Sequence, residues 1–111
     1  MEAKTSFHFE VEKSPDDQFG NKVTTIRCHG KVTADNVGEL REVVKPLLPL
    51  GGRVVIDLTD VHFLDSSGLG TFVALKVSAL KQGLCILEFV NMTSRVLELL
   101  RLSRLDKVLA S

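Results

Sequence analysis

The sequence predicts a single α/β domain in which helices cover one face of a mixed β-sheet. Three observations support this class. An opening stretch over about residues 6–12 alternates apolar and polar side chains, and the β-branched stretch after it has the pattern of an antiparallel partner. From Asn36 onward strand and helix patterns alternate, which implies parallel strands joined by helical crossovers. Only three helices are predicted, and three cannot cover both faces of the sheet.

Length and composition fit one domain. The 111 residues are 44% hydrophobic and 25% charged, so we assign residues 1–111 to one unit with a core over about 22–110. Basic and acidic residues number 14 each, and phenylalanine is the only aromatic residue apart from histidine. A nucleic-acid partner is therefore not expected. Neither a secretory leader nor a long apolar run is recognisable, so we expect a cytoplasmic protein without membrane contact.

The first two strands are predicted to form a hairpin. Apolar residues occupy every second position from Phe7 to Val11. A turn-rich connection, Ser14–Asn21, leads to a β-branched strand over about Lys22–His29. Gly30 is expected to end this second strand.

A helix and a buried strand come next. Asn36 and Glu39 have the spacing of a helix N-terminal cap, in which the glutamate reaches back to a free backbone N–H. Pro46 and Pro49 are expected to end this helix. The run Arg53–Leu58 is almost continuously apolar, a pattern typical of a strand covered on both faces.

The last third of the chain continues the alternation. After a short connection we predict a helix over Gly68–Lys81, a strand over Leu84–Val90 and a third helix capped by Thr93 or Ser94. The apolar tail Val108–Ala110 is predicted as an edge strand. One side of the helix at 68–81 is expected to carry Leu69, Phe72, Val73, Val77 and Leu80.

Cysteine and histidine offer no site of their own. Cys28 and Cys85 lie inside apolar strand patterns and are expected to be buried, reduced thiols. His8, His29 and His62 do not have metal-ligand spacing, so we expect solvated or hydrogen-bonded side chains. We therefore expect neither a metal nor another cofactor.

The best candidate for a functional motif lies where a buried strand gives way to a helix. A serine at a helix N-terminus can cap the helix with its hydroxyl oxygen, or it can carry a phosphoryl group that the free N–H groups tolerate. Local composition alone favours capping. The motif reads Asp65-Ser66-Ser67-Gly68-Leu69-Gly70.

An enzymatic role for this motif is weakly supported. Ser66 as a nucleophile would need a base, and although His62 is close in sequence, the Gly-x-Ser-x-Gly elbow is missing. The stretch Gly30–Thr33 resembles only part of a phosphate-binding loop. We therefore predict a binding protein, not an enzyme, and keep a serine hydrolase as the least favoured alternative.

With these motifs in view, the chain closely resembles bacterial anti-sigma factor antagonists, which are members of the STAS domain family. The resemblance rests mainly on Val55–Gly70, which contains Asp-Ser-Ser-Gly-Leu-Gly between a strand and a helix. The stretches Gly30–Thr33, leading to Asn36, and Val90–Leu105 resemble the family as well. The similarity thus extends over nearly the whole chain and implies a STAS-like fold.

The resemblance implies phosphorylation of Ser66, the serine directly after the aspartate, by an anti-sigma factor serine kinase that uses ATP. A protein phosphatase would reverse the modification. The unphosphorylated form would bind the anti-sigma factor and free a sigma factor. The partner-binding residues that the resemblance implies are Asp65, Ser66, Ser67, Gly68, Leu69 and Thr33.

Two points qualify the resemblance. Thr33 stands where many relatives have Asp, in a loop that faces the phosphorylation site, so the partner or its affinity can differ. An alternative within the same fold is a STAS-domain subunit of a lipid-transport or other signalling assembly without sigma control. Ser67, left free in either case, is expected to help cap the helix that begins near Gly68.

Overall fold

The computed structural model describes residues 7–110 and contains one four-stranded sheet in the order β1-β2-β3-β4. β1 runs antiparallel to β2, whereas β2, β3 and β4 are parallel, so the predicted mixed sheet is confirmed. The strands are β1 (Phe7–Ser14), β2 (Val23–Val32), β3 (Gly52–Leu64) and β4 (Cys85–Val90). The helices are α1 (Val37–Val44), α2 (Ser66–Gln82), α3 (Ser94–Leu102) and α4 (Asp106–Ala110), with a 3-10 helix η1 (Lys45–Leu50) after α1.

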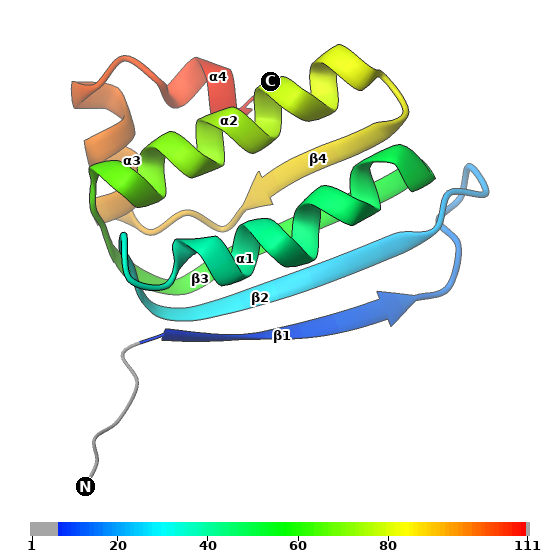
Figure 1. Ribbon diagram of the computed structural model, residues 1–111, viewed down its shortest axis with the longest axis horizontal. Coiled ribbons are helices and arrows are strands. Elements are labelled where there is room, and N and C mark those ends of the chain that lie inside the picture. The colour runs from blue at the N-terminus through cyan, green and yellow to red at the C-terminus, as the bar shows by residue number, and fades with distance from the viewer. Residues whose placement is uncertain (1–6, 111) are drawn as a thin grey trace, which may run out of the picture.

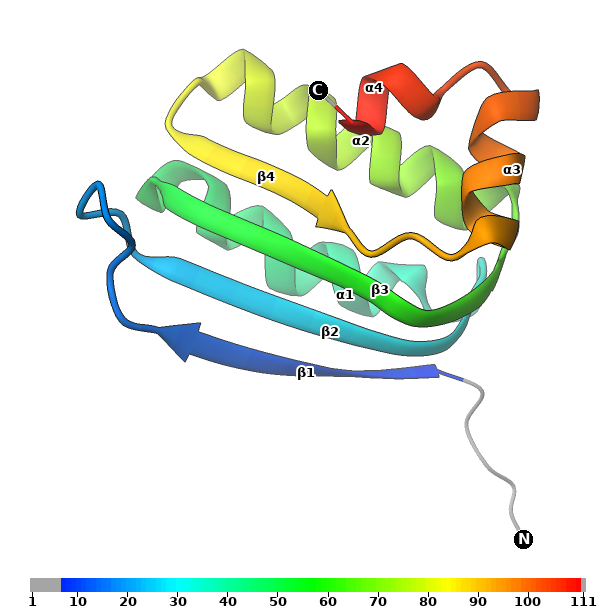
Figure 2. The same ribbon diagram turned by 180° about the vertical axis from the view of Figure 1, so that it is seen from behind.

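The helices α1 and α2 lie side by side on one face of the sheet (Figure 1). Seen from behind, the sheet stands in front of them, and no helix crosses the opposite face of β1 and β2 (Figure 2). α3 packs against β3, and α4 packs against α2 and β4. The core therefore lies between one side of the sheet and one layer of helices. Its most deeply buried large side chains include Ile26, Leu40, Ile56, Phe72 and Leu87.

The central strand β3 alternates between the two sides of the sheet. Val54, Ile56 and Leu58 are buried under the helices, while the residues between them are only partly covered. The expectation that Arg53–Leu58 is covered on both faces is therefore wrong. The strand is apolar on its open face at Val55, but no helix among residues 7–110 is packed over that face (Figure 2).

Gly30 does not end β2. The strand continues to Val32, and Gly30 adopts a φ of 101° at a point where the pairing with β3 shifts register. A glycine tolerates this backbone conformation, so the ladder is interrupted without the strand being broken. β3 likewise continues to Leu64, where a connection was expected. The longer pair of strands brings the end of β2 beside the end of β3, with Val32 opposite Leu64.

The start of α1 matches the prediction in position but not in chemistry. Asn36 is the N-cap residue, yet its side chain does not cap the helix. Its Oδ1 accepts the Thr33 N–H at 3.0 Å, and its Nδ2 donates to the Lys31 carbonyl oxygen at 2.9 Å. The end of α1 is as expected, because Pro46 interrupts the α-helical hydrogen bonds and the chain continues as the shorter η1.

The buried face of α2 differs from the predicted one. Val77 and Leu80 are 40% and 61% exposed, whereas the lysine at 76 is buried. The Lys76 Nζ donates to the Leu87 carbonyl oxygen at 2.6 Å, and burial lowers the pKa of Lys76. A lysine stem can cover apolar surface while its ammonium group binds a hydrogen-bond acceptor. The prediction counted only apolar residues as buried, and it therefore left Lys76 out. The residues that are buried on this helix are Gly68, Thr71, Phe72, Leu75, Lys76 and Ala79.

The C-terminal segment is a helix and not an edge strand. The sequence left the cap of α3 open between Thr93 and Ser94. The structure shows Thr93, whose Oγ1 accepts the Val96 N–H at 3.3 Å. After α3 the chain turns at Arg104, which has a φ of 61°, and α4 follows. Leu109 is 1% exposed, so the apolar tail fills the core as a helix instead of extending the sheet.

The two cysteines are free and buried, as predicted. Burial is the main cause that raises the pKa of the Cys28 thiol to about 12, and it also raises the pKa of Cys85. A thiol that stays protonated at neutral pH is a poor nucleophile. Both side chains therefore serve packing.

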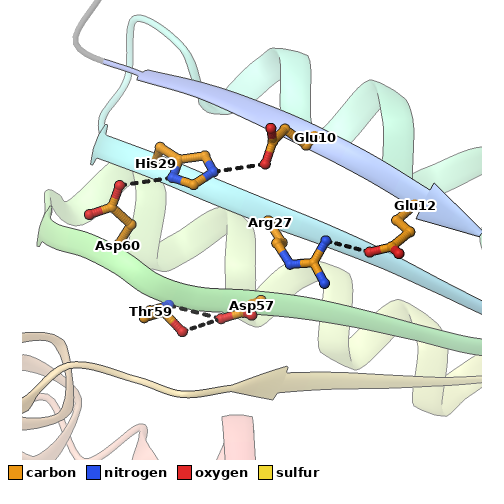
Figure 3. Close-up of polar contacts among 7 residues, drawn as sticks. All are labelled: Glu10, Glu12, Arg27, His29, Asp57, Thr59 and Asp60. Atoms are coloured by element: carbon orange, nitrogen blue, oxygen red, sulfur yellow. Dashed lines mark hydrogen bonds and ion pairs between the residues drawn. The ribbon is translucent and has the colours of Figure 1, made fainter.

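The open face of the sheet is covered by charged side chains instead of helices (Figure 3). His29 on β2 connects three strands, because its Nδ1 lies 2.8 Å from Asp60 Oδ2 on β3 and its Nε2 lies 3.1 Å from Glu10 Oε1 on β1. Arg27 pairs with Glu12 on the same face. The hydrogen bond to Asp60, followed by that to Glu10, raises the pKa of His29.

The raised pKa of His29 means that its contribution to the free energy of unfolding depends on pH. A raised folded-state pKa means that the contribution is full below the unfolded value of about 6.5 and is lost as pH rises through the folded pKa. We expect His29→Gln to cost more stability at pH 6 than at pH 9, as measured by urea denaturation. The stacked His8 ring, 4.6 Å away, and His62 stay unchanged in this variant. An equal cost at both pH values would contradict the prediction.

Candidate functional site

The residue that organises the predicted site is Asp65, the single residue between β3 and α2. Its Oδ1 accepts the Gly68 N–H at 2.8 Å, which makes Asp65 the side-chain cap of α2. Its Oδ2 accepts the Ala34 N–H at 3.1 Å, and its own N–H donates to the Val32 carbonyl oxygen at 3.1 Å. Asp65 thereby fixes the start of α2 to the end of β2 and to the loop that follows.

These contacts also keep the Asp65 carboxylate charged. The backbone hydrogen bond from Gly68 is the largest cause that lowers the pKa of Asp65, and the bond from Ala34 acts in the same direction. Both donors stabilise the ionised form. The negative charge beside the serines is therefore present at neutral pH and is satisfied by backbone N–H groups.

Ser66 and Ser67 are the first two residues of α2, and both are exposed. The prediction that Ser67 helps cap the helix is wrong, because Asp65 already takes that role. Neither serine hydroxyl makes a hydrogen bond to another residue within 7–110. Capping and phosphorylation thus do not compete for the same side chain, and both hydroxyls are open to a reagent from solvent.

Thr33 lies close to this site because the next residue, Ala34, is hydrogen-bonded to Asp65. Ala34 donates to Asp65, so the loop between β2 and α1 lies against the start of α2. The Thr33 Oγ1 accepts hydrogen bonds from the Asp35 N–H and the Asn36 Nδ2, both at 3.3 Å. The hydroxyl of Thr33 is therefore used inside its own loop, and a contact between Thr33 and a partner stays a prediction.

Gly68 and Leu69 are buried or half-buried, so their main role at this site is packing. Gly68 is buried, and a Cβ at this position would lie 2.8 Å from the Val32 carbonyl oxygen. Only a residue without a side chain lets α2 approach the end of β2 so closely. Leu69 is half-buried and packs against the core. These two residues set the position of the serines, whereas Ser66 and Ser67 present the accessible polar groups.

The arrangement suits a transferred phosphoryl group better than catalysis. Asp65 already binds the Gly68 N–H, so the feature of the first turn of α2 that favours an added phosphate is the positive partial charge of the helix N-terminus. His62 is exposed, and its Nε2 lies 3.7 Å from Asp60 Oδ1. It is not in hydrogen-bond contact with Ser66, so the base that a serine hydrolase needs is not in place.

Other ligand types find little support between residues 7 and 110. That part of the chain contains no group of three or more histidine, cysteine, aspartate or glutamate side chains arranged to hold a metal ion. None of its helices combines the length and apolar character needed to cross a bilayer.

Sequence reasoning missed part of this site. Val32 and Ala34 act through backbone atoms, which carry no side-chain signature. It also missed Arg41 and Lys45, two exposed cations that line the same groove between α1 and α2 as Ser67. They are four residues apart in the chain, but only the packing of α1 and α2 shows that they line the same groove as Ser67.

Comparison with known proteins gives a consistent result. A family profile described as "Mlab, STAS domain" matches residues 16–110. The anti-sigma-B factor antagonist of Bacillus subtilis (strain 168) is 32% identical over 84 residues, which cover 76% of this chain and 76% of that protein.

Solved structures are similar in fold. The anti-sigma factor antagonist SpoIIAA in its unphosphorylated form gives a TM-score of 0.69 at 18% identity, covering 90% of this chain and 84% of that chain. The Bacillus cell fate determinant SpoIIAA in the phosphorylated form gives 0.65 at 17% identity, covering 90% and 86%. At this level of identity, both similarities concern the fold alone.

Proposed function

The chain belongs to the STAS domain family, and we propose that it works as an anti-sigma factor antagonist controlled by phosphorylation of Ser66. In its unphosphorylated form it binds an anti-sigma factor that is also a serine kinase, and this binding frees a sigma factor. ATP supplies the phosphoryl group that the kinase transfers to the Ser66 hydroxyl. A protein phosphatase removes it, and the cycle takes place in the cytoplasm.

The observation that carries this proposal is that Asp65 caps α2 while the Ser66 hydroxyl is exposed and has no structural role. Asp65 caps α2 and bonds to the loop after β2, so the fold does not need the Ser66 hydroxyl. Ser66 is exposed at the first position of the helix. A residue that can be modified without loss of structure, in a surface that a partner can cover, has the properties of a switch.

Family relatives support the proposal at two levels. The relative that is 32% identical is an anti-sigma-B factor antagonist. SpoIIAA, which shares the fold, exists in a phosphorylated and an unphosphorylated form. In this role the chain is a binding protein and not an enzyme, and its partners are proteins, with neither nucleic acid nor membrane involved.

The alternative, a STAS-domain subunit of a lipid-transport or other signalling assembly, keeps the same surface but needs no phosphate. The family profile carries the name Mlab and does not mention sigma control, so membership alone does not choose between the two functions. The curated relative favours the first. Phosphorylation by an anti-sigma factor separates them.

Phosphorylation of the purified chain tests this function. Incubation with ATP and the kinase-fold anti-sigma factor of the same organism should add one phosphate on Ser66, because its hydroxyl is exposed and directly follows Asp65. Fragmentation mass spectrometry locates the phosphate. Ser66→Ala should stay unmodified and Ser67→Ala should be modified as wild type is. Phosphate on Ser67 alone would reverse the assignment, and an absence of phosphate would favour the assembly subunit.

A further inference from the structure

A groove of about 480 Å³ runs between α1 and α2 on the helical side of the molecule. Its buried lining residues are Val37 on α1 and Thr71 and Leu75 on α2. The small residues Gly38, Gly70 and Ala74 line it as well. Ala34 and Ser67 line it where the two helices begin. The groove is therefore continuous with the candidate site, and small side chains leave room for a segment of another protein between the helices.

The charge of this groove has one sign. Arg41 and Lys45 line it, and both are exposed. No aspartate or glutamate is among its lining residues, although α1 also carries Glu39 and Glu42. Within residues 7–110 neither cation forms an ion pair. Two exposed positive charges, without an ion-pair partner among residues 7–110, thus border an open and partly apolar groove, and an acidic ligand complements them in charge.

We propose that this groove receives an acidic segment of the anti-sigma factor, so that the antagonist is held by α1 and α2 as well as by the serine loop. The proposal rests on the function proposed above. Carboxylates of the segment pair with Arg41 and Lys45, while its small or apolar side chains contact Ala74. Charged groups at the rim of an interface mainly raise the association rate and set the choice of partner.

The position of the groove also connects it to the switch. Ser67 lines one end of the groove, and Ser66 is the preceding residue, about 3.8 Å away along the chain. A phosphate on Ser66 is therefore close to the end of the groove at Ser67. Charges this close are only partly screened, because the screening length is about 8 Å at physiological salt. Because the phosphate and the acidic segment are both negative, modification repels the segment at the end where it enters beside α2.

Site-specific crosslinking identifies what occupies the groove. A photo-crosslinking residue, benzoylphenylalanine, is placed at Ala74 in the groove, and in a separate variant at Ile86, which is exposed on the opposite side of the sheet. Both are irradiated with the purified kinase-fold anti-sigma factor of the same organism. We expect the Ala74 variant to crosslink to a segment rich in aspartate and glutamate, and the Ile86 variant to give little product. A crosslink from Ala74 to a basic or neutral segment overturns the proposal.

Charge reversal measures the contribution of the cations. The double variant Arg41→Glu, Lys45→Glu is compared with Lys81→Glu, Lys107→Glu, which changes the net charge equally at exposed positions outside the groove. We expect the groove variant to lose about tenfold or more in affinity at low salt and the control less than threefold, with the difference shrinking as salt rises. Circular dichroism establishes that both variants are folded.

The outcomes distinguish this proposal from the function on which it rests. If wild type binds the anti-sigma factor and the groove variant binds as the control does, the groove proposal is overturned and the antagonist function stands. If wild type does not bind at all, the antagonist function is overturned and the groove proposal with it. Should the groove variant fail to fold, the crosslink from Ala74 decides, because that variant keeps both cations.

Discussion

Phosphorylation of Ser66 is expected to weaken binding to the anti-sigma factor by a hundredfold or more while the domain stays folded. Phosphate adds close to two negative charges at neutral pH, next to the charge that Asp65 already carries. A partner surface that fits a neutral serine then faces repulsion and a group that is costly to desolvate. A loss of about 3 kcal/mol corresponds to roughly a hundredfold in affinity, since each ~1.4 kcal/mol is tenfold.

The start of α2 offsets only part of this effect. The helix dipole favours a negative charge at its N-terminus by about 0.3–1 kcal/mol near the surface. This stabilises the modified domain itself, which explains why folding should survive modification. The same contribution is present in the free protein and in the complex, so it does not restore binding. The charge lowers affinity because it lies in the contact surface, without any large rearrangement of the domain.

Titration calorimetry of wild type, the phosphorylated protein and three variants measures this effect. Ser66→Asp should reproduce part of the loss, because one carboxylate carries less charge than a phosphate, and Ser66→Ala should bind well and never switch off. Ser94→Asp is the matched control, since it places the same charge at the exposed first position of another helix, α3, outside the predicted partner-binding residues and the groove. Equal affinity of wild type, Ser66→Asp and the phosphorylated form would end the switch hypothesis. Loss of binding together with loss of the circular dichroism signal would assign Ser66 a structural role.

The sequence correctly predicted that the motif lies between a strand and a helix, but it put the start of the helix near Gly68 instead of Ser66 and the cap at Ser67 instead of Asp65. Asp65, the two serines and the start of α2 are neighbours in the chain, so their geometry follows from helix-capping chemistry. Which of the three residues caps the helix could not be chosen from composition, because aspartate and serine are both favoured caps. The bond from the Gly68 N–H to Asp65 Oδ1 identifies the cap. The second bond of this carboxylate, from the Ala34 N–H, spans 31 positions and has no local signature in the sequence.

The parts that were predicted wrongly depend on packing between distant segments. Gly30 can end a strand or make a bulge, and the choice depends on the neighbouring β3, with which β2 stays paired up to Val32. The tail that contains Leu109 is apolar enough for a strand, but it packs as a helix against α2 and β4. Lys76 is buried only because the Leu87 carbonyl oxygen lies within reach. None of these partners is visible in a local pattern.

Gly68→Ala is expected to be the most destabilising single-methyl change at the site. A Cβ here would lie 2.7 Å from Leu64 Cδ1, 2.8 Å from the Val32 carbonyl oxygen and 3.0 Å from Val32 Cγ1. The leucine can turn away at modest cost. The carbonyl oxygen cannot, because it belongs to the backbone of β2 and accepts the Asp65 N–H at 3.1 Å. Overpacking of this kind commonly costs about 1–3 kcal/mol.

Gly70 provides a matched control two residues along the same helix. A Cβ at Gly70 meets nothing within 4 Å, so Gly70→Ala should gain helix propensity and stabilise the protein by up to about 1 kcal/mol. Urea denaturation, with a slope m common to both variants, measures the difference. Both variants gain helix propensity, so we expect Gly68→Ala to be less stable than Gly70→Ala by the overpacking cost of about 1–3 kcal/mol. Equal stability would mean that α2 can move away from β2 without cost. In that case the bond between Asp65 and the end of β2 could not hold the serines in place, and the rigid platform on which the switch depends would be lost.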